Sequence, residues 1–183
     1  MKHLLPIRRG IDTMQTQLEL RRNPQLWDKH PERTEDNSSP HREVEDIWVR
    51  FAGSYAEGGA PHFSLWYDSA DTLPSVKRHA RDILHLVGGD ALGGVLITRI
   101  PAGKQVYPHI DKGWHAEYYD KFLLVLEGHQ QQLFCFEDGQ HSSPTGDLFW
   151  FHNQQSHWVL NESPVDRISL IVCVKMDKPF GGV

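Results

Sequence analysis

Two histidines and a carboxylate lie in this chain in an arrangement suited to binding a metal ion. His109 and Asp111 are two residues apart in the segment 107–111, Tyr-Pro-His-Ile-Asp, and His157 lies far downstream. Two imidazoles and one carboxylate on one side of Fe(II) leave its remaining coordination positions open to other ligands. The three residues therefore predict a non-haem iron site in which each of them is a ligand.

An arginine and a serine follow the second histidine at a spacing that is rare by chance. Arg167 and Ser169 lie ten and twelve residues after His157, and such a pattern is expected in only ~4% of chains of this composition. The period of two in a strand places both side chains on one face, among apolar neighbours. A buried guanidinium is costly without a partner, so we expect a ligand carboxylate to pair with Arg167 if no protein carboxylate does.

The His-x-Asp pair is a weak signal by itself, because about one such pair is expected by chance in a chain with many histidines. Three pairs have the same shape with glutamate: His30-x-Glu32, His41-x-Glu43 and His115-x-Glu117. The first two lie in a polar loop, whereas the third lies close to His109 and is the rival site. His152 is the alternative to His157 as the distal ligand.

The elements that must position these residues are mainly strands. We expect strands at 46–51, 63–67, 94–101, 121–127, 132–137, 147–151, 158–161 and 167–175. Many short strands separated by glycine-containing turns predict a sandwich or barrel, and the absence of βαβ alternation argues against a doubly wound sheet. His109 and Asp111 then lie at the end of an extended segment, where both side chains can point into the mouth of a barrel.

Helices are expected mainly before these strands. Residues 1–45 read as a helical and loop extension, with a helix at 12–22 that has Met14 and Leu18 on one side, and a polar loop at 31–45.

The strongest helix signal covers residues 74–87. Asp71 or Thr72 can cap this helix, a proline suits its first turn, and two glycines end it. Its apolar residues recur at three- and four-residue spacing, so we expect one buried face that packs on the outside of a sheet. The β core is then expected to cover residues 46–176, with this helix within it.

The composition favours one domain without a nucleic-acid partner. The chain has 183 residues, 39% of them hydrophobic, and a formal net charge of −5, which suits a single domain over residues 1–183. Charges of both signs are scattered, whereas nucleic-acid-binding proteins have a basic face. The apolar runs are too short for a signal peptide or a membrane span, so we expect a cytoplasmic protein without membrane contact.

Four motifs in the second half of the chain together resemble one enzyme family. They are Pro108-His109-Ile110-Asp111, the segment 146–151 (GDLFWF), His157-Trp158-Val159-Leu160-Asn161 and the segment 166–172 (DRISLIV). In this order they resemble the aspartyl/asparaginyl β-hydroxylase family of Fe(II)- and 2-oxoglutarate-dependent oxygenases, over about residues 45–176. The resemblance implies a mainly β fold with flanking helices, namely a double-stranded β-helix (jelly-roll, cupin-like).

The resemblance also implies roles for particular residues. His109, Asp111 and His157 would hold Fe(II), Arg167 would bind the distal carboxylate of 2-oxoglutarate, and Ser169 would assist Arg167. Some members of the family have glycine in place of the carboxylate ligand, so Asp111 is a departure toward the full triad of the wider superfamily. A further cofactor-binding residue is expected at Lys121, which opens the strand after the ligand loop, near where relatives place a second basic residue.

The function implied by the resemblance is hydroxylation of an aliphatic C–H bond, with release of succinate and CO2. Candidate substrate contacts are Trp48 and Arg50, which share one face of strand 46–51, and Trp114 and His115. The expected substrate is an amino-acid-like small molecule or a peptide with an Asp- or Asn-like side chain. Two alternatives stay open: a cupin-like metal-dependent hydrolase or isomerase, and a non-catalytic metal-binding sensor on the same barrel.

Overall fold

The computed structural model describes residues 2–54 and 59–180. Its strands are β1 (Leu4–Arg8), β2 (Glu45–Phe51), β3 (Leu65–Trp66), β4 (Ala91–Ile100), β5 (Gln105–His109), β6 (Asp120–Glu127), β7 (Gln132–Phe136), β8 (Gly139–Ser142), β9 (Leu148–Phe151), β10 (His157–Asn161) and β11 (Arg167–Lys175). The helices are α1 (Met14–Arg22), α2 (Ser69–Thr72), α3 (Pro74–Val87) and α4 (Trp114–Tyr118), with a short 3-10 turn at Pro24–Leu26.

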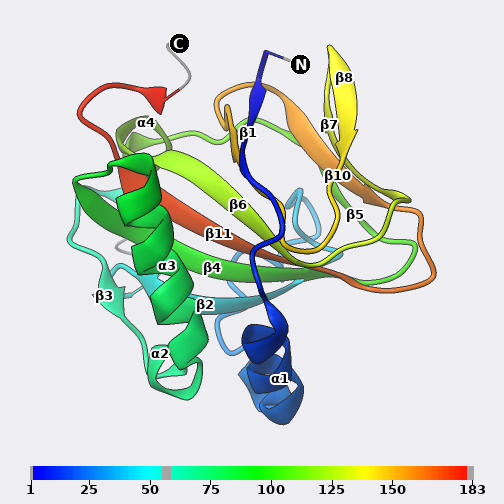
Figure 1. Cartoon of the computed structure of the whole chain (residues 1–183), viewed down its shortest axis with the longest axis horizontal. Helices are drawn as coiled ribbons and strands as arrows, with labels where there is room; N and C mark the ends of the chain where they lie inside the picture. The colour runs from blue at the N-terminus through cyan, green and yellow to red at the C-terminus, as the bar shows by residue number, and fades with distance from the viewer. Residues whose placement is uncertain (1, 55–58, 181–183) are drawn as a thin grey trace.

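The strands form two antiparallel sheets that face each other, with α3 and α1 outside the larger one (Figure 1). In the described residues the larger sheet has the order β1-β9-β6-β11-β4-β2-β3, and the smaller has the order β5-β10-β7-β8. From β4 onward the chain crosses repeatedly between the sheets, because β4, β6, β9 and β11 belong to the larger and β5, β7, β8 and β10 to the smaller. Two sheets wound in this way form a double-stranded β-helix, or jelly roll. The fold class expected from the sequence is therefore confirmed.

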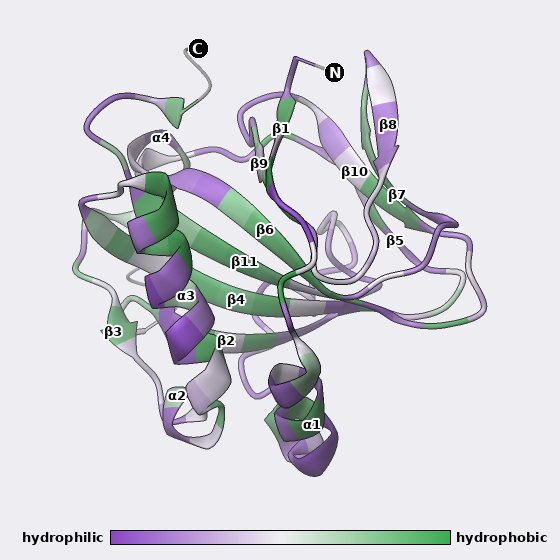
Figure 2. Ribbon diagram, viewed as in Figure 1, coloured by the Kyte–Doolittle hydropathy of each residue, from purple (hydrophilic) through white to green (hydrophobic). Residues whose placement is uncertain are grey.

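Strand β11 shows how one sequence supplies two buried faces. Ile168, Leu170 and Val172 pack with apolar residues of α1, α2 and α3 on the outer side of the larger sheet, whereas Ile171 packs with the apolar core between the sheets. Figure 2 shows β11, β4 and β6 as largely hydrophobic ribbons beneath α3, whose other side is hydrophilic. The face assignment predicted for this strand from its period of two is confirmed, and it turns Arg167 and Ser169 toward the interior between the sheets.

Helix α3 has the predicted bounds but not the predicted cap. Gly88 ends the helix in the left-handed conformation, with φ of 68°, which glycine adopts without steric cost. Neither Asp71 nor Thr72 caps the N-terminus, because both fall in the separate turn α2. Instead the Ser75 N–H and hydroxyl both donate to the Glu19 carboxylate of α1, at 3.1 and 2.6 Å. A carboxylate from another helix thus satisfies one orphan backbone N–H of the first turn.

The first 45 residues differ most from the expected helical and loop extension. The segment Leu4–Arg8 forms strand β1, which pairs with β9 at the edge of the larger sheet. On α1, Met14 and Leu18 are exposed, while Leu20 is buried against the sheet. Those apolar side chains therefore do not form the packed side of the helix.

Other departures from the sequence-based expectation are local. The strand expected at 63–67 is limited to β3, and β8 and α4 occur where turns and a ligand loop were expected. Within residues 2–54 and 59–180, no helix combines the length and the apolar character needed to cross a membrane.

Candidate metal centre and its two cavities

The two histidines and the aspartate meet at one end of the smaller sheet. His109 is the last residue of β5 and His157 the first of β10, and the two lie directly opposite each other in the antiparallel pair. Asp111 follows β5 by two residues, and its N–H donates to the Asn153 carbonyl at 3.0 Å. One Asp111 carboxylate oxygen lies 3.7 Å from the Nε2 of His109, and the other lies 4.0 Å from the Nε2 of His157. A single ion can contact all three groups from this arrangement.

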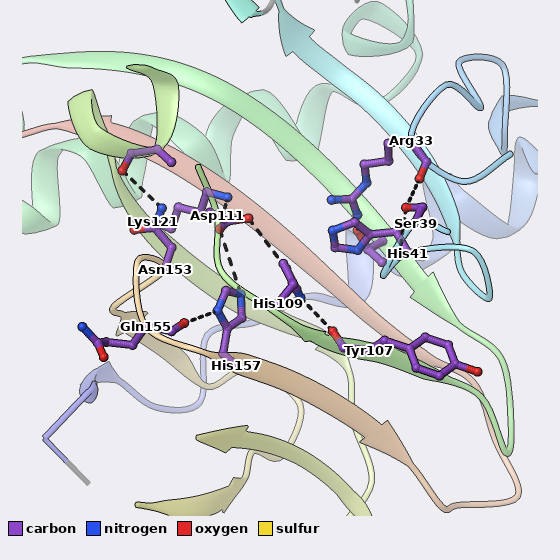
Figure 3. A network of polar contacts seen from close by, with 12 residues as sticks. Arg33, Ser39, His41, Tyr107, His109, Asp111, Lys121, Asn153, Gln155 and His157 are labelled. Carbon is purple, nitrogen blue, oxygen red and sulfur yellow. Dashed lines mark hydrogen bonds and ion pairs between the residues drawn. The ribbon is translucent and has the colours of Figure 1, made fainter. Parts of the chain in front are cut away.

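Both imidazoles are held in the tautomer that a metal ligand needs. The Nδ1–H of His109 donates to the Tyr107 carbonyl, and that of His157 donates to the Gln155 carbonyl, each at 2.8 Å (Figure 3). A carbonyl oxygen can only accept, so the proton is on Nδ1 and the lone pair of each ring is on Nε2. Burial lowers the pKa of His157 to about 4 and also lowers that of His109. Both rings are therefore neutral at neutral pH, with Nε2 directed toward Asp111.

Lys121 of β6 contacts the Asp111 carboxylate and so belongs to the same cluster as the two histidines. Its Nζ donates to an Asp111 carboxylate oxygen at 2.6 Å (Figure 3). Burial alone would raise the pKa of Asp111, but the charges of Lys121 and His157 and the Lys121 hydrogen bond hold that pKa at about 2. Asp111 is thus an anion at any physiological pH, as metal coordination requires.

Arg167 faces the cavity between the sheets from the opposite wall. It begins β11 in the larger sheet and is only 2% exposed. Its guanidinium donates to the Ser169 hydroxyl on the same face of the strand, and no ion pair of Arg167 is found among the described residues. Burial lowers the pKa of Arg167 to about 10, so the group stays charged at neutral pH. A buried cation without a carboxylate partner is costly and calls for an anionic ligand.

A small cavity separates Arg167 from the histidines. This inner cavity has a volume of about 50 Å³ and is lined by His109, Asp111, His157, Arg167 and Ser169, together with apolar side chains of both sheets. A larger cleft of about 790 Å³, the outer cleft, lies next to it. The residues that line both are Arg33, His41, Asp111, Lys121 and Ile171. The two spaces therefore adjoin each other at the metal-binding cluster.

The loop between α1 and β2 closes one side of this region, although the sequence predicts only a polar loop there. The Arg33 Nε donates to an Asp46 carboxylate oxygen at 2.5 Å, and its Nη2 donates to the Thr98 hydroxyl at 3.2 Å. Asp46 is 1% exposed, so this is a buried ion pair between the loop and the larger sheet. Arg33 is a cavity-lining residue that sequence reasoning missed, because its partners lie on two later strands.

His41 is the second residue that sequence reasoning did not place at the site. Its ring meets that of His109 edge to face, with 4.7 Å between centroids. Its Nδ1 is buried and has no hydrogen-bond partner among the described residues. Nearby, the Tyr107 N–H donates to the Pro40 carbonyl at 2.9 Å, which ties the same loop to the smaller sheet. No local pattern in the sequence signals this contact.

The four candidate substrate residues are divided between two hollows. Trp48 and His115 line the outer cleft, whereas Arg50 and Trp114 line a second pocket. The pairing of β2 with β4 shifts register between Trp48 and Arg50. Such a bulge bends a strand and re-aims its side chains. The two residues therefore line different hollows, and their contact with substrate stays a prediction.

The rival ligands do not form a comparable cluster. Among the described His, Cys, Asp and Glu side chains, one group lies close enough together to share an ion, and it consists of His109, Asp111 and His157. His115 lines the outer cleft while Glu117 lines the second pocket. His152 stacks on Trp150, with 5.7 Å between ring centroids. The structure thus brings together the three residues of the predicted iron site and leaves the alternatives outside it.

Comparisons with solved structures find the same fold in oxygenases of low sequence identity. A prolyl hydroxylase from Trichoplax adhaerens, solved with a hypoxia-inducible-factor peptide fragment, matches with a TM-score of 0.66 and 12% identity, over 96% of this chain and 84% of that one. A viral collagen prolyl hydroxylase from Paramecium bursaria chlorella virus 1, in complex with 2OG (2-oxoglutarate), matches with a TM-score of 0.58 and 10% identity, over 95% and 96%. A 2OG-Fe(II) oxygenase family oxidoreductase from Burkholderia pseudomallei matches with a TM-score of 0.53 and 12% identity, over 72% and 67%.

Two further comparisons give no match. No protein-family model matches the sequence, and no curated protein matches it. At these identities the structural likeness establishes the fold alone.

Proposed function

We propose that the protein is an Fe(II)- and 2-oxoglutarate-dependent dioxygenase that hydroxylates an aliphatic C–H bond. The observation that carries the proposal is the pairing, across one cavity, of the His109–Asp111–His157 cluster with the buried Arg167 that has no carboxylate partner among the described residues. The structural likeness to oxygenases that include a 2OG complex supports the same reaction type.

The residues present fit both groups on their own chemistry. Two imidazole Nε2 atoms with free lone pairs and one ionised carboxylate are the facial set preferred by non-haem Fe(II). Arg167 offers a planar fork that binds a carboxylate bidentately, and the Ser169 hydroxyl lies beside it. The inner cavity of about 50 Å³ is smaller than the roughly 300–1,000 Å³ of ordinary ligand pockets. A five-carbon diacid would therefore also occupy space shared with the outer cleft.

Bound Fe(II), with 2-oxoglutarate and dioxygen, would supply the oxidising chemistry that converts C–H to C–OH and releases succinate and CO2. The chain's own residues have simpler tasks. His109, Asp111 and His157 fix the metal on one side, and Arg167 with Ser169 orients the diacid from the opposite sheet. Leu123, Phe134, Val159 and Ile171 line the inner cavity with apolar side chains that exclude water.

Lys121 has two roles open to it within this proposal. Its Nζ donates a hydrogen bond to the Asp111 carboxylate and so holds that anion in place. Lys121 also lines both the inner cavity and the outer cleft. A carboxylate of the co-substrate would meet this ammonium group as well as Arg167.

For the substrate we propose an amino-acid-like or peptidyl side chain that enters the outer cleft, where Trp48 and His115 form part of the wall. The resemblance of the motifs favours an Asp- or Asn-like side chain. Two of the structural neighbours are prolyl hydroxylases, one of them with a bound peptide fragment. A prolyl residue is therefore the competing acceptor, and a peptide is supported as the form of the substrate.

The test is release of succinate from 2-oxoglutarate by the purified chain, with Fe(II) and air, across free amino acids and peptides that contain Asp, Asn or Pro. We expect succinate release that depends on 2-oxoglutarate and falls to background in His109→Ala. Metal content measured on the same samples separates the alternatives. A zinc or manganese protein that releases no succinate with any acceptor would instead be a cupin-like hydrolase, isomerase or sensor.

A further inference from the structure

A second pocket lies beside the outer cleft and is larger than a packing defect. It has a volume of about 710 Å³, and its lining includes Arg50, His62, Phe63, Tyr118 and Lys175. Phe63 is 94% exposed and Tyr118 49% exposed. Exposed aromatic side chains that border a hollow are typical of surfaces that bind a polypeptide.

Arg50 is the unusual member of this lining. It is half-buried on β2, and burial lowers the pKa of its guanidinium. Among the described residues, Arg50 makes one hydrogen bond, a long contact to the Leu92 carbonyl at 3.3 Å, and its buried Nε has no partner. The guanidinium lies 5.0 Å over the Trp66 ring. A guanidinium has five N–H donors, so most of the hydrogen-bonding capacity of Arg50 is left for a ligand.

The second pocket also contains Lys175, and little negative charge offsets its two cationic side chains. Lys175, the last residue of β11, lies 5.5 Å from the Tyr118 ring, and no carboxylate lies within ion-pair distance of it in the described residues. Glu117 is the acidic residue in the described lining, and its side chain is exposed. The charge of the pocket interior is therefore positive, which suits a carboxylate.

The second pocket and the outer cleft share a wall of aromatic rings. His62 lines the pocket and His115 lines the cleft, and their rings stack with 5.9 Å between centroids. In an extended peptide each residue advances about 3.3 Å, so a segment of a few residues crosses such a wall. A free amino acid is too short to occupy both hollows.

We propose that the second pocket binds an acidic side chain of a peptide substrate, a few residues from the one that enters the outer cleft, with Arg50 and Lys175 as its partners. This inference rests on the proposed function and specifies the substrate as an acidic peptide rather than a free amino acid.

The experiment measures peptide binding to the full chain, independently of turnover. The probes are fluorescein-labelled eleven-residue peptides of Gly, Ala and Ser with a central Asn, Asp or Pro. Each peptide carries either Glu or Gln at one other position, and the set covers every position in turn. Fluorescence polarisation should show that Glu at one or more positions binds roughly tenfold tighter than Gln, as expected for charge-assisted hydrogen bonds.

Variants assign that preference to the pocket. Arg50→Gln should remove the preference for Glu, and Lys175→Gln should reduce it. Arg81→Gln, at an exposed position of α3, is the matched control and should leave it unchanged. Lys175→Glu should shift the preference toward peptides that carry Lys. If Arg50→Gln unfolds, shown by loss of its thermal transition, Arg50→Lys and the two Lys175 variants carry the test.

Equal binding of Glu and Gln peptides at every position, or a preference that survives Arg50→Gln, would overturn the inference. Its failure is distinguishable from failure of the proposed function. Succinate release without a preference for Glu contradicts the second pocket alone. A preference that Arg50→Gln removes, in a chain that releases no succinate with any peptide, keeps the pocket as an acidic-peptide site and contradicts the oxygenase.

Discussion

The two sheets contribute to the site in different ways. On the smaller sheet His109 and His157 are fully held, because each Nδ1–H has a backbone acceptor and each Nε2 faces Asp111. On the larger sheet Arg167 is buried, and within residues 2–54 and 59–180 its side-chain partner is the Ser169 hydroxyl alone. The first arrangement is complete before a ligand arrives, whereas the second is completed by one. Under the proposed function, the metal half would fix the geometry of the site and the arginine half would select the co-substrate.

The largest effect is expected from the metal half. His157→Ala removes one of the two imidazoles and should abolish succinate release and lower Fe(II) affinity by roughly tenfold or more. Succinate assays and metal titration of the purified variant check this. His152→Ala, which removes the rejected ligand, is the control and should keep both properties. Loss of activity in His152→Ala with retention in His157→Ala would reverse the ligand assignment.

A change on the larger sheet should separate co-substrate binding from metal binding. Arg167→Lys keeps a charge but loses the bidentate fork, so the KM for 2-oxoglutarate should rise roughly tenfold to a hundredfold while Fe(II) affinity is retained. Steady-state succinate release and metal titration measure the two quantities. An unchanged KM would remove Arg167 from this role.

The loop 31–44 contacts both sheets. The contribution of its buried Arg33–Asp46 ion pair can be measured as a change in the free energy of unfolding. Arg33→Met leaves the buried Asp46 carboxylate without its cation, so the free energy of unfolding should fall by about 3 kcal/mol. Urea denaturation of the chelator-treated protein measures it. The control is Lys104→Met, since Lys104 is half-exposed and pairs with Glu43 of the same loop at 3.6 Å. That variant should cost less than about 1 kcal/mol, and equal losses would argue against a buried anchor.

The smallest effect expected is a pH dependence at the wall between the cleft and the second pocket. Burial lowers the pKa of His115 to about 3, from an ordinary value of 6.5. Between pH 7 and pH 5 the unfolded state therefore takes up a proton that the folded state does not, and folding loses at most about 2 kcal/mol from this residue.

His115→Asn should remove that part of the acid destabilisation, so its unfolding free energy should fall by about 2 kcal/mol less than that of the unchanged chain over the same pH range. Urea denaturation with a chelator present at both pH values measures the difference. The exposed His85 supplies the control variant His85→Asn. Identical pH slopes for the chain and His115→Asn would show that His115 does not stay neutral in the folded state.

The parts of the fold that follow from local pattern could be predicted from the sequence. Alternation along β11 places Arg167 and Ser169 inside, and a proline at the start and a glycine at the end bound α3 correctly. The spacing of His157 and Arg167 was informative because one short turn joins β10 of the smaller sheet to β11 of the larger sheet. The two residues therefore line one cavity from opposite sheets.

The parts that depend on contacts between distant segments could not be predicted. The segment Leu4–Arg8 is a strand because its partner β9 lies far later in the chain. Arg33 and His41 reach the site only because Asp46, Thr98 and Tyr107 hold their loop in place. The bulge that sends Arg50 to the second pocket arises from pairing with β4, and a strand read alone gives no sign of it.

The most direct test of the central claim is the affinity of the Fe(II)-loaded chain for two keto acids, measured by calorimetry without oxygen. 2-Oxoglutarate and 2-oxopentanoate have the same length, but only the first has the distal carboxylate that Arg167 would bind. The unchanged chain should bind 2-oxoglutarate roughly a hundredfold more tightly, and Arg167→Gln should bind the two almost equally. Equal affinities in the unchanged chain would contradict the account.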